Sequence, residues 1–266
     1  MAIKLFVSDI DGTMAISGKD PSEKNIAAVQ DLIKAGVIVT VATGRMYRAA
    51  LPIAQALKID APIISYNGAM IKTVGGEILY SNYLAPELVV ELIEFFQQKN
   101  HHLQTYSNDI LRYAEHNHFS EGYELSQRTK GDAVGWDGLK KFTENVCKVL
   151  SIFDTPEENE KFSAELKEKF AGRIDVTKSH PLLAEIISPG VSKAAAIKIL
   201  AKKFGIDKSE IAAIGDGDND LPMLLEAGMS IAMGNAPAEV KNACSLITDT
   251  CENDGVAQAI YKYILK

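Results

Sequence analysis

The chain has 266 residues, of which 47% are hydrophobic and 24% charged, and its net charge is −7. This composition is typical of a globular protein and excludes a disordered or coiled-coil chain. The acidic balance argues against nucleic acid or an anionic membrane as a partner, because both attract basic surfaces. We therefore expect a small-molecule partner, bound by a monomer or a small homo-oligomer.

The cysteines and the N-terminus bear on the compartment. Cys147, Cys244 and Cys251 form no C-x-x-C pair and leave an odd count, which favours neither a disulfide framework nor a zinc site. An acidic pair interrupts the apolar run near the N-terminus, so we expect no signal peptide. No segment reaches the roughly 18 apolar residues of a membrane span. These features predict a cytoplasmic protein.

The N-terminal third alternates between predicted strands and helices. Residues 4–8, 37–42 and 62–66 are apolar runs rich in β-branched side chains, without the alternation of half-exposed strands. Residues 22–35 carry apolar side chains at helical spacing, with Ser22 as the N-cap and Gly36 beyond the end. A further helix follows Arg45, and Pro52 is expected to kink it or delay its start.

The middle of the chain has a different pattern. An amphipathic helix is predicted over residues 86–99, and another opens at Thr155 with a capping box. Short strand-like segments at residues 103–107, 110–114, 173–179 and 182–188 suggest antiparallel pairing. We therefore predict an α+β domain over residues 84–187, inserted into a second domain.

The C-terminal part returns to the first pattern, with a helix over residues 192–204 and strands at residues 211–214 and 229–233. The predicted fold class is α/β: a doubly wound, mostly parallel, Rossmann-like core sheet with an inserted α+β cap domain. The core domain is discontinuous and comprises residues 1–83 and 188–266.

Polar residues follow four of the predicted strands, where ligands of open parallel sheets bind. They are Asp9 and Asp11 after the first, Thr43, Gly44 and Arg45 after the second, Asn67 and Gly68 after the third, and Asp216, Asn219 and Asp220 after the fourth, with Lys193 opening the preceding helix. Each motif alone is more often a turn or a cap. Their occurrence together at one sheet edge favours a site of chemistry.

These residue types suit phosphoryl transfer assisted by a divalent cation. Asp9 and Asp216 supply the hard oxygen ligands that Mg²⁺ prefers, and a bound cation offsets the repulsion between the carboxylates. An aspartate can serve as nucleophile through an aspartyl-phosphate. Thr43 and helix-start N–H groups can hold phosphate oxygens, while Lys193 adds positive charge. Asp11 can protonate the leaving oxygen and then deprotonate water.

The set D-I-D-G-T, T-G-R, a lone lysine and G-D-G-D-N-D resembles the haloacid dehalogenase (HAD) superfamily, and the layout resembles its Cof-type phosphatases with a type IIB cap. The resemblance implies that Asp9 is the nucleophile and a ligand of Mg²⁺, and that Asp11 is the general acid/base and binds Mg²⁺ through its carbonyl. It also implies that Asp216 binds the metal and that Asp220 supports the metal shell.

The resemblance assigns the remaining motif residues to the substrate. Thr43, Gly44 and Lys193 would bind the transferring phosphoryl group, and Asn219 would contact phosphate. Arg45, Asn67 and Gly68 would lie near the substrate entrance. The cap would close over the site and select a small phosphorylated metabolite, such as a sugar phosphate. The cap residues that could recognise the leaving group, called candidate readers below, are Tyr106, Arg112, Tyr113, His116, His118 and His180. Tyrosines and histidines are, however, more often ordinary packing or surface residues.

Three alternatives remain beside a phosphatase. A phosphomutase of the same superfamily uses the same aspartyl-phosphate, and only its product differs. A receiver domain phosphorylated on aspartate places its acceptor after the third strand, where this chain has Tyr66 and Asn67. A non-catalytic phospho-ligand-binding protein on the same fold is disfavoured by the intact acid pair.

Overall fold

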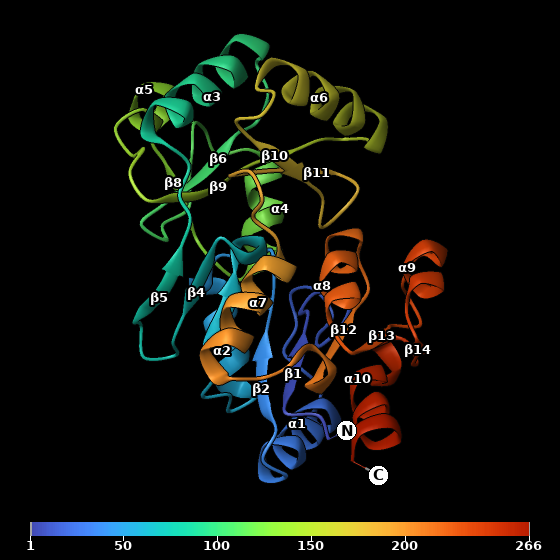
Figure 1. The fold of residues 1–266 in the computed structure, drawn as a ribbon. Coiled ribbons are helices and arrows are strands. Elements are labelled where there is room, and N and C mark those ends of the chain that lie inside the picture. Colours follow the sequence, from blue (N-terminus) through green and yellow to red (C-terminus); the bar gives the residue numbers. More distant parts are fainter. Residues whose placement is uncertain (1, 266) are drawn as a thin grey trace. The chain divides into compact units, whose positions relative to one another are not determined.

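The computed structural model describes residues 2–265, and the chain divides into two compact units (Figure 1). Residues 1–80 and 192–266 form one unit, which we call the core unit. Residues 81–191 form the other, which we call the inserted unit. Over residues 2–265, no helix combines the length and the apolar character needed to cross a membrane.

The core unit is built on a sheet of five parallel strands in the order β14-β13-β12-β1-β2. Their bounds are β1 Leu5–Ser8, β2 Ile38–Val41, β12 Ile211–Gly215, β13 Met229–Ala232 and β14 Leu246–Ile247. The chain continues from β1 to one side of the sheet and from β12 to the other, so the strand order reverses between these two neighbours. The predicted doubly wound sheet is confirmed, and its ligand-binding switch point lies between β1 and β12.

The third predicted strand differs from the expectation of a regular parallel strand. β3 (Ile63–Ser65) pairs with the parallel sheet through the isolated bridge between Ala42 and Ile64, and it pairs antiparallel with β4 (Met70–Lys72). With β5 (Ile78–Ser81) it forms a small three-stranded sheet. The reversal after β3 is local, because Tyr66 and Asn67 both adopt positive φ angles, 53° and 56°.

The α-helices of the core unit include the predicted helix capped by Ser22. They are α1 Glu23–Lys34, α2 Tyr47–Ala56, α7 Lys193–Phe204, α8 Leu221–Glu226, α9 Ala238–Ala243 and α10 Gly255–Ala259. Ser22 accepts a hydrogen bond from the N–H of Asn25, and Ser192 accepts one from the N–H of Ala195. Ile197 and Leu200 of α7 belong to the same buried apolar cluster as Leu5 of β1.

Pro52 does not delay the start of helix α2, which begins at Tyr47 and runs through the proline. A proline leaves the carbonyl four residues earlier, here that of Arg48, without its helical donor. Arg48 and Pro52 both lie on the exposed side of the helix. The helix therefore tolerates the proline on its outer side.

The inserted unit contains a six-stranded sheet in the order β10-β11-β9-β6-β7-β8. The strands are β6 Gln104–Ser107, β7 Arg112–Tyr113, β8 Asp132–Ala133, β9 Val146–Ile152, β10 Asp175–Thr177 and β11 Leu183–Ile187. All pairs are antiparallel except β7 with β8. The helices are α3 Pro86–Lys99, α4 His118–Gln127, α5 Gly135–Leu139 and α6 Pro156–Lys169. This is the α+β architecture predicted from the sequence.

Helices α3 and α6 supply the apolar core of the inserted unit. The ring of Phe162 in α6 lies 5.6 Å from that of Phe95 and 5.0 Å from that of Phe96, both in α3, between ring centroids. Thr155 caps α6 by accepting a hydrogen bond from the N–H of Glu158, as predicted. Each unit therefore has a hydrophobic core of its own.

Candidate active site

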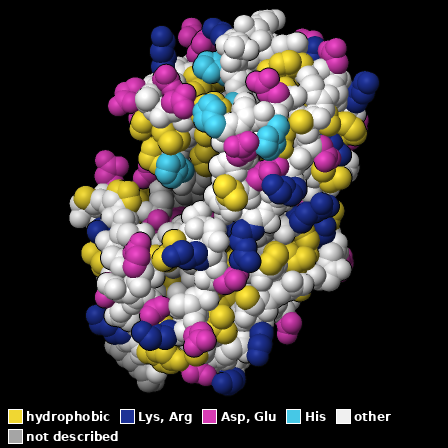
Figure 2. Space-filling view, turned by 180° about the vertical axis from the view of Figure 1, so that it is seen from behind, with side chains coloured by type: hydrophobic (Ala, Val, Ile, Leu, Met, Phe, Trp, Pro, Cys, Tyr) yellow, Lys and Arg dark blue, Asp and Glu magenta, His cyan; other side chains and the backbone are white. Residues whose placement is uncertain are grey.

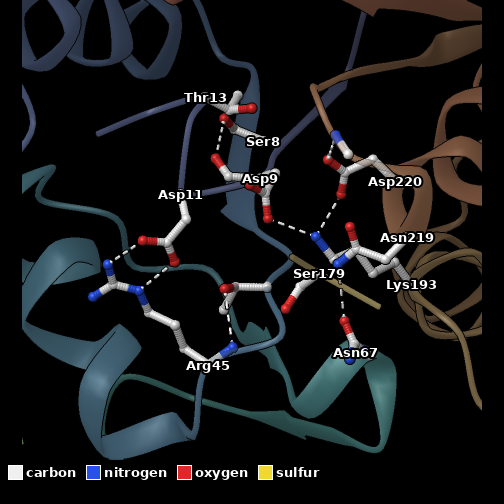
Figure 3. A network of polar contacts seen from close by, with 12 residues as sticks. Ser8, Asp9, Asp11, Thr13, Arg45, Asn67, Ser179, Lys193, Asn219 and Asp220 are labelled. Atoms are coloured by element: carbon white, nitrogen blue, oxygen red, sulfur yellow. Dashed lines mark hydrogen bonds and ion pairs between the residues drawn. The ribbon is translucent and has the colours of Figure 1, made fainter. Parts of the chain in front are cut away.

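Asp9 and Lys193 form the centre of a buried polar cluster at the switch point of the core sheet (Figure 3). Asp9 follows β1, and its N–H donates to the carbonyl of Ile214 in β12, which fixes it between the two strands. Its carboxylate Oδ1 lies 2.5 Å from the Nζ of Lys193, and the same Nζ lies 2.5 Å from Oδ1 of Asp220. The lysine thus bridges two carboxylates that come from different strand ends.

Lys193 is 1% exposed and occupies the first position of α7, where the helix dipole disfavours a cation. Burial lowers the pKa of its ammonium group, but the carboxylates of Asp220 and Asp9 outweigh burial and raise the pKa above its usual value. Lys193 is therefore positively charged in the folded protein. The two acidic neighbours account for a lysine at a helix start.

Asp220 organises the loop after β12. Its Oδ2 accepts hydrogen bonds from the N–H groups of Asp216, at 3.0 Å, and Gly217, at 2.9 Å. A Cβ on Gly215 would collide with the Asp220 side chain, so this turn requires the glycine. With its Oδ1 on Lys193, Asp220 holds both the loop and the lysine in place.

The carboxylates of Asp9, Asp216 and Asp220 fit a cation. Each offers an oxygen, and these oxygens all lie within 4.8 Å of one another. Burial, followed by the charge of Asp220, raises the pKa of Asp9 well above its usual value. Burial also raises the pKa of Asp216 to about 6. A cation would relieve this unfavourable ionisation, and hard carboxylate oxygens are the ligands that Mg²⁺ prefers.

Asp11 lies apart from this cluster of three carboxylates, because its side chain contacts Arg45 (Figure 3). The Nε of Arg45 donates to Oδ2 of Asp11 at 2.7 Å, and an Nη atom of Arg45 donates to Oδ1 at 2.6 Å. Arg45 is 3% exposed, whereas the Asp11 side chain is 32% exposed. The substrate-entrance arginine of the sequence prediction thus holds the predicted acid/base by a bidentate ion pair.

Polar side chains from the segments after β2, β3 and β12 form further hydrogen bonds in the core unit. Thr43 is buried, and its hydroxyl accepts a hydrogen bond from the N–H of Arg45, across Gly44. Asn219 donates to the side-chain oxygen of Asn67. Asn67 is 2% exposed, and its side-chain NH₂ has no hydrogen-bond partner among residues 2–265. Buried donors are normally paired, so this NH₂ has a hydrogen bond left to give to a ligand.

Gly68 and Lys193 are held against each other by backbone packing. The φ of Gly68 is +102°, and a Cβ there would collide with the carbonyl of Ser192. The structure therefore brings together residues from all four predicted strand ends with the start of α7. The candidate readers Tyr106, Arg112, Tyr113, His116, His118 and His180 all belong to the inserted unit, where the hydroxyl of Tyr113 donates to Glu124.

Two residues of the cluster were not assigned a role from the sequence. Thr13 donates to Oδ1 of Asp216 at 2.6 Å, and Asn235 donates to Oδ2 of the same carboxylate at 3.3 Å. Asn235 lies in the loop that follows β13. The rule that ligands bind beyond the ends of parallel strands, applied to this fifth strand, would have found it.

Comparisons with known proteins agree with this fold and site. The chain is 30% identical to the 5-amino-6-(5-phospho-D-ribitylamino)uracil phosphatase YitU of Bacillus subtilis over 97% of both chains. A haloacid dehalogenase-like hydrolase from Bacteroides thetaiotaomicron superposes with a TM-score of 0.89 at 31% identity, covering 98% of this chain and 99% of the other. The subclass IIB sugar phosphatase BT4131, at 24% identity, shares the fold with a TM-score of 0.84 over 98% of each chain.

The fold and these relatives define the class of the protein, which is a phosphatase with an α/β core and an inserted α+β unit. The sequence profile of the haloacid dehalogenase-like hydrolases matches residues 6–260. The chain therefore belongs to the haloacid dehalogenase-like hydrolase family, as its motifs indicated.

Proposed function

We propose that the protein is a Mg²⁺-dependent phosphomonoesterase that hydrolyses small phosphorylated metabolites through an aspartyl-phosphate on Asp9. The observation that carries the proposal is the bridging of Asp9 and Asp220 by Lys193, with Asp216 beside them. This cluster combines a buried carboxylate as nucleophile, the positively charged side chain of Lys193 and a set of oxygen ligands for a metal. The backbone carbonyl of Asp11 would complete the protein ligands. Bound Mg²⁺ would supply charge neutralisation for the phosphoryl oxygens.

The chain's own residues divide the chemistry into two steps. An Asp9 carboxylate oxygen attacks phosphorus, the bond from phosphorus to the leaving oxygen breaks, and Asp11 gives that oxygen a proton. Water then attacks phosphorus, Asp11 takes a proton from it, and the bond to Asp9 breaks to release inorganic phosphate. All five histidines lie between residues 101 and 180, outside the core unit, which supports a carboxylate as the proton carrier.

The phosphoryl group would lie against Lys193 and the amide and hydroxyl groups beside it. The charged Nζ of Lys193 is a donor suited to phosphate oxygens, and we propose that the amide of Asn67 contacts the substrate. Thr43, Gly44 and Asn219 line the same side, whereas Asp220 supports the lysine and the metal-binding loop. We propose that Arg45 acts mainly by holding Asp11.

The substrate class and setting complete the proposal. We propose that residues 84–187 form a cap domain that selects the leaving group, while residues 1–83 and 188–266 form the catalytic core. Sugar phosphates and similar polyol phosphates are the first candidates, because the relative YitU is named for a phosphorylated ribityl compound. The net charge of −7 and the mixture of acidic and basic side chains in Figure 2 support a small-molecule partner over nucleic acid or a membrane. Three free thiols support a reducing, cytoplasmic setting, and we propose a monomer or a small homo-oligomer.

The test is phosphate release from a panel of phosphorylated metabolites, with and without Mg²⁺. The panel includes hexose and pentose phosphates, nucleotides and 5-amino-6-(5-phospho-D-ribitylamino)uracil. We expect release of inorganic phosphate that depends on Mg²⁺ and is lost in Asp9→Asn. Asp218→Asn is the matched control, because Asp218 is an exposed acid of the loop that contains Asp216.

Two outcomes would contradict the assignment. Turnover in Asp9→Asn equal to that of the wild type would remove the nucleophile. An isomerised sugar phosphate in place of free phosphate, with a sugar bisphosphate present, would instead identify a phosphomutase. For Asp11→Asn we expect turnover to fall by roughly 10²- to 10⁴-fold while substrate binding is retained, because the residue carries protons.

A further inference from the structure

Asn235 connects three separate segments of the core unit through its side-chain amide. Its NH₂ group donates to the carbonyl of Gly12 at 2.9 Å and to Oδ2 of Asp216 at 3.3 Å. Its oxygen accepts a hydrogen bond from the N–H of Cys251 at 2.9 Å. One side chain thus joins the turn after β1, the loop after β12 and the turn that opens at Cys251.

The orientation of this amide follows from its two backbone partners. The N–H of Cys251 can only donate and the carbonyl of Gly12 can only accept, so the amide oxygen faces Cys251 and the NH₂ faces Gly12 and Asp216. The loop that carries Asn235 is itself anchored, because the N–H of Gly234 donates to the carbonyl of Asp249 at 2.9 Å. Asn235 therefore presents its donors to Asp216 from a fixed position.

Asp216 is held on both of its oxygens by neutral donors. Thr13 donates to Oδ1 at 2.6 Å, and Asn235 donates to Oδ2. The turn at Gly12 packs so closely on this carboxylate that a Cβ there would collide with Oδ2. Neutral donors orient a carboxylate without cancelling its charge, and its remaining lone pairs stay available to a cation.

We propose that Asn235 is a positioning residue that orients the Asp216 carboxylate and the Gly12 turn for Mg²⁺ binding. This inference rests on the proposed function, since it concerns the cation of the same site. Among residues 2–265, Asn235 forms no hydrogen bond with Asp9, Asp11 or Lys193. Its removal should therefore weaken the binding of the cation more than it slows turnover once the cation is bound.

Isothermal titration calorimetry with Mg²⁺, in the absence of substrate, measures this effect directly on the full chain. We expect Asn235→Ala to weaken Mg²⁺ binding by about 10-fold, because loss of a residue that orients a metal ligand typically has an effect of this size in other metalloproteins. At saturating Mg²⁺, kcat should stay within about threefold of the wild type, because the reacting groups are unchanged. Asn253→Ala is the matched control, since the Asn253 side chain donates to Asp249 in the neighbouring turn and, among residues 2–265, forms no hydrogen bond with Gly12 or Asp216.

Each outcome of the experiment decides the proposal. Mg²⁺ affinity of Asn235→Ala within about twofold of the wild type would overturn it, as would an equal loss in Asn253→Ala. If the alanine variant does not fold, Asn235→Ser replaces it, because a serine hydroxyl is too short to reach from Cys251 to Asp216. A wild-type protein that binds no Mg²⁺ would overturn the proposed cofactor as well, whereas normal binding by the wild type and the variant alike overturns this inference alone.

Discussion

The guanidinium group of Arg45 contacts both carboxylate oxygens of Asp11, at 2.7 and 2.6 Å, from the other side of the switch point. Arg45 is buried, so its planar fork fixes the direction in which the more exposed Asp11 carboxylate points. Because Asp11 is the proposed proton carrier, its orientation relative to the leaving oxygen determines turnover. The ion pair therefore links the second strand end to the chemistry at the first.

We expect Arg45→Lys to lower kcat by roughly 10- to 100-fold with little change in KM, because a lysine keeps the charge but cannot hold both oxygens. Steady-state kinetics with the best substrate of the panel measures both constants. Arg48→Lys, at an exposed position in the same segment, is the control. A large rise in KM with kcat unchanged would show instead that Arg45 binds substrate.

Lys193 should be essential to the stability of the protein without metal. Its replacement by methionine leaves the buried carboxylates of Asp9 and Asp220 without their shared cation. We expect Lys193→Met to lower the free energy of unfolding by about 3–5 kcal/mol, the range for removing one partner of a buried ion pair. Denaturant unfolding in EDTA measures this, with Lys198→Met as control, since the side chain of Lys198 in the same helix is 63% exposed. Equal effects of the two substitutions would contradict this role of Lys193.

The raised pKa of Asp216 predicts how stability without metal depends on pH. Burial raises this pKa from 3.8 to about 6, so between these values the folded state holds a proton that the unfolded state has lost. The free energy of unfolding contributed by this group therefore falls as pH rises through that window. Comparison of wild type with Asp216→Asn, which cannot titrate, isolates the contribution, and a difference independent of pH would contradict it. With Mg²⁺ present, the stabilisation by the metal should increase over the same window, because protons and Mg²⁺ compete for one carboxylate.

Local sequence signals predicted the elements that position the site. Ser22, Ser192 and Thr155 cap their helices in the structure because a capping hydroxyl needs only the N–H groups that follow it in the chain. The strand ends could be predicted for a similar reason: a buried parallel strand is a continuous apolar run, so the first polar residues after it mark its end. The doubly wound sheet and the inserted α+β unit followed from these local patterns.

Contacts between distant segments were not readable from the sequence. Asn235 and Gly12 are 223 residues apart, and their hydrogen bond depends on how the loops after β13 and β1 meet. In the inserted unit, Lys148 and Glu185 form a fully buried ion pair, although each alone is typical of a surface strand position. The antiparallel return after β3 depends on positive φ angles at Tyr66 and Asn67, and tyrosine carries no signal for that conformation.

The most direct test of the central claim is to trap the phosphoenzyme. Enzyme and an excess of substrate are mixed with Mg²⁺ and quenched in acid within the first turnover, and borohydride then reduces any acyl phosphate to the corresponding alcohol. We predict that mass spectrometry of the N-terminal peptide will find homoserine in place of Asp9 and an unchanged Asp11, and that Asp9→Asn will give no such product. Rapid phosphate release with no modification at Asp9, or with the modification at another carboxylate, would contradict the proposed mechanism.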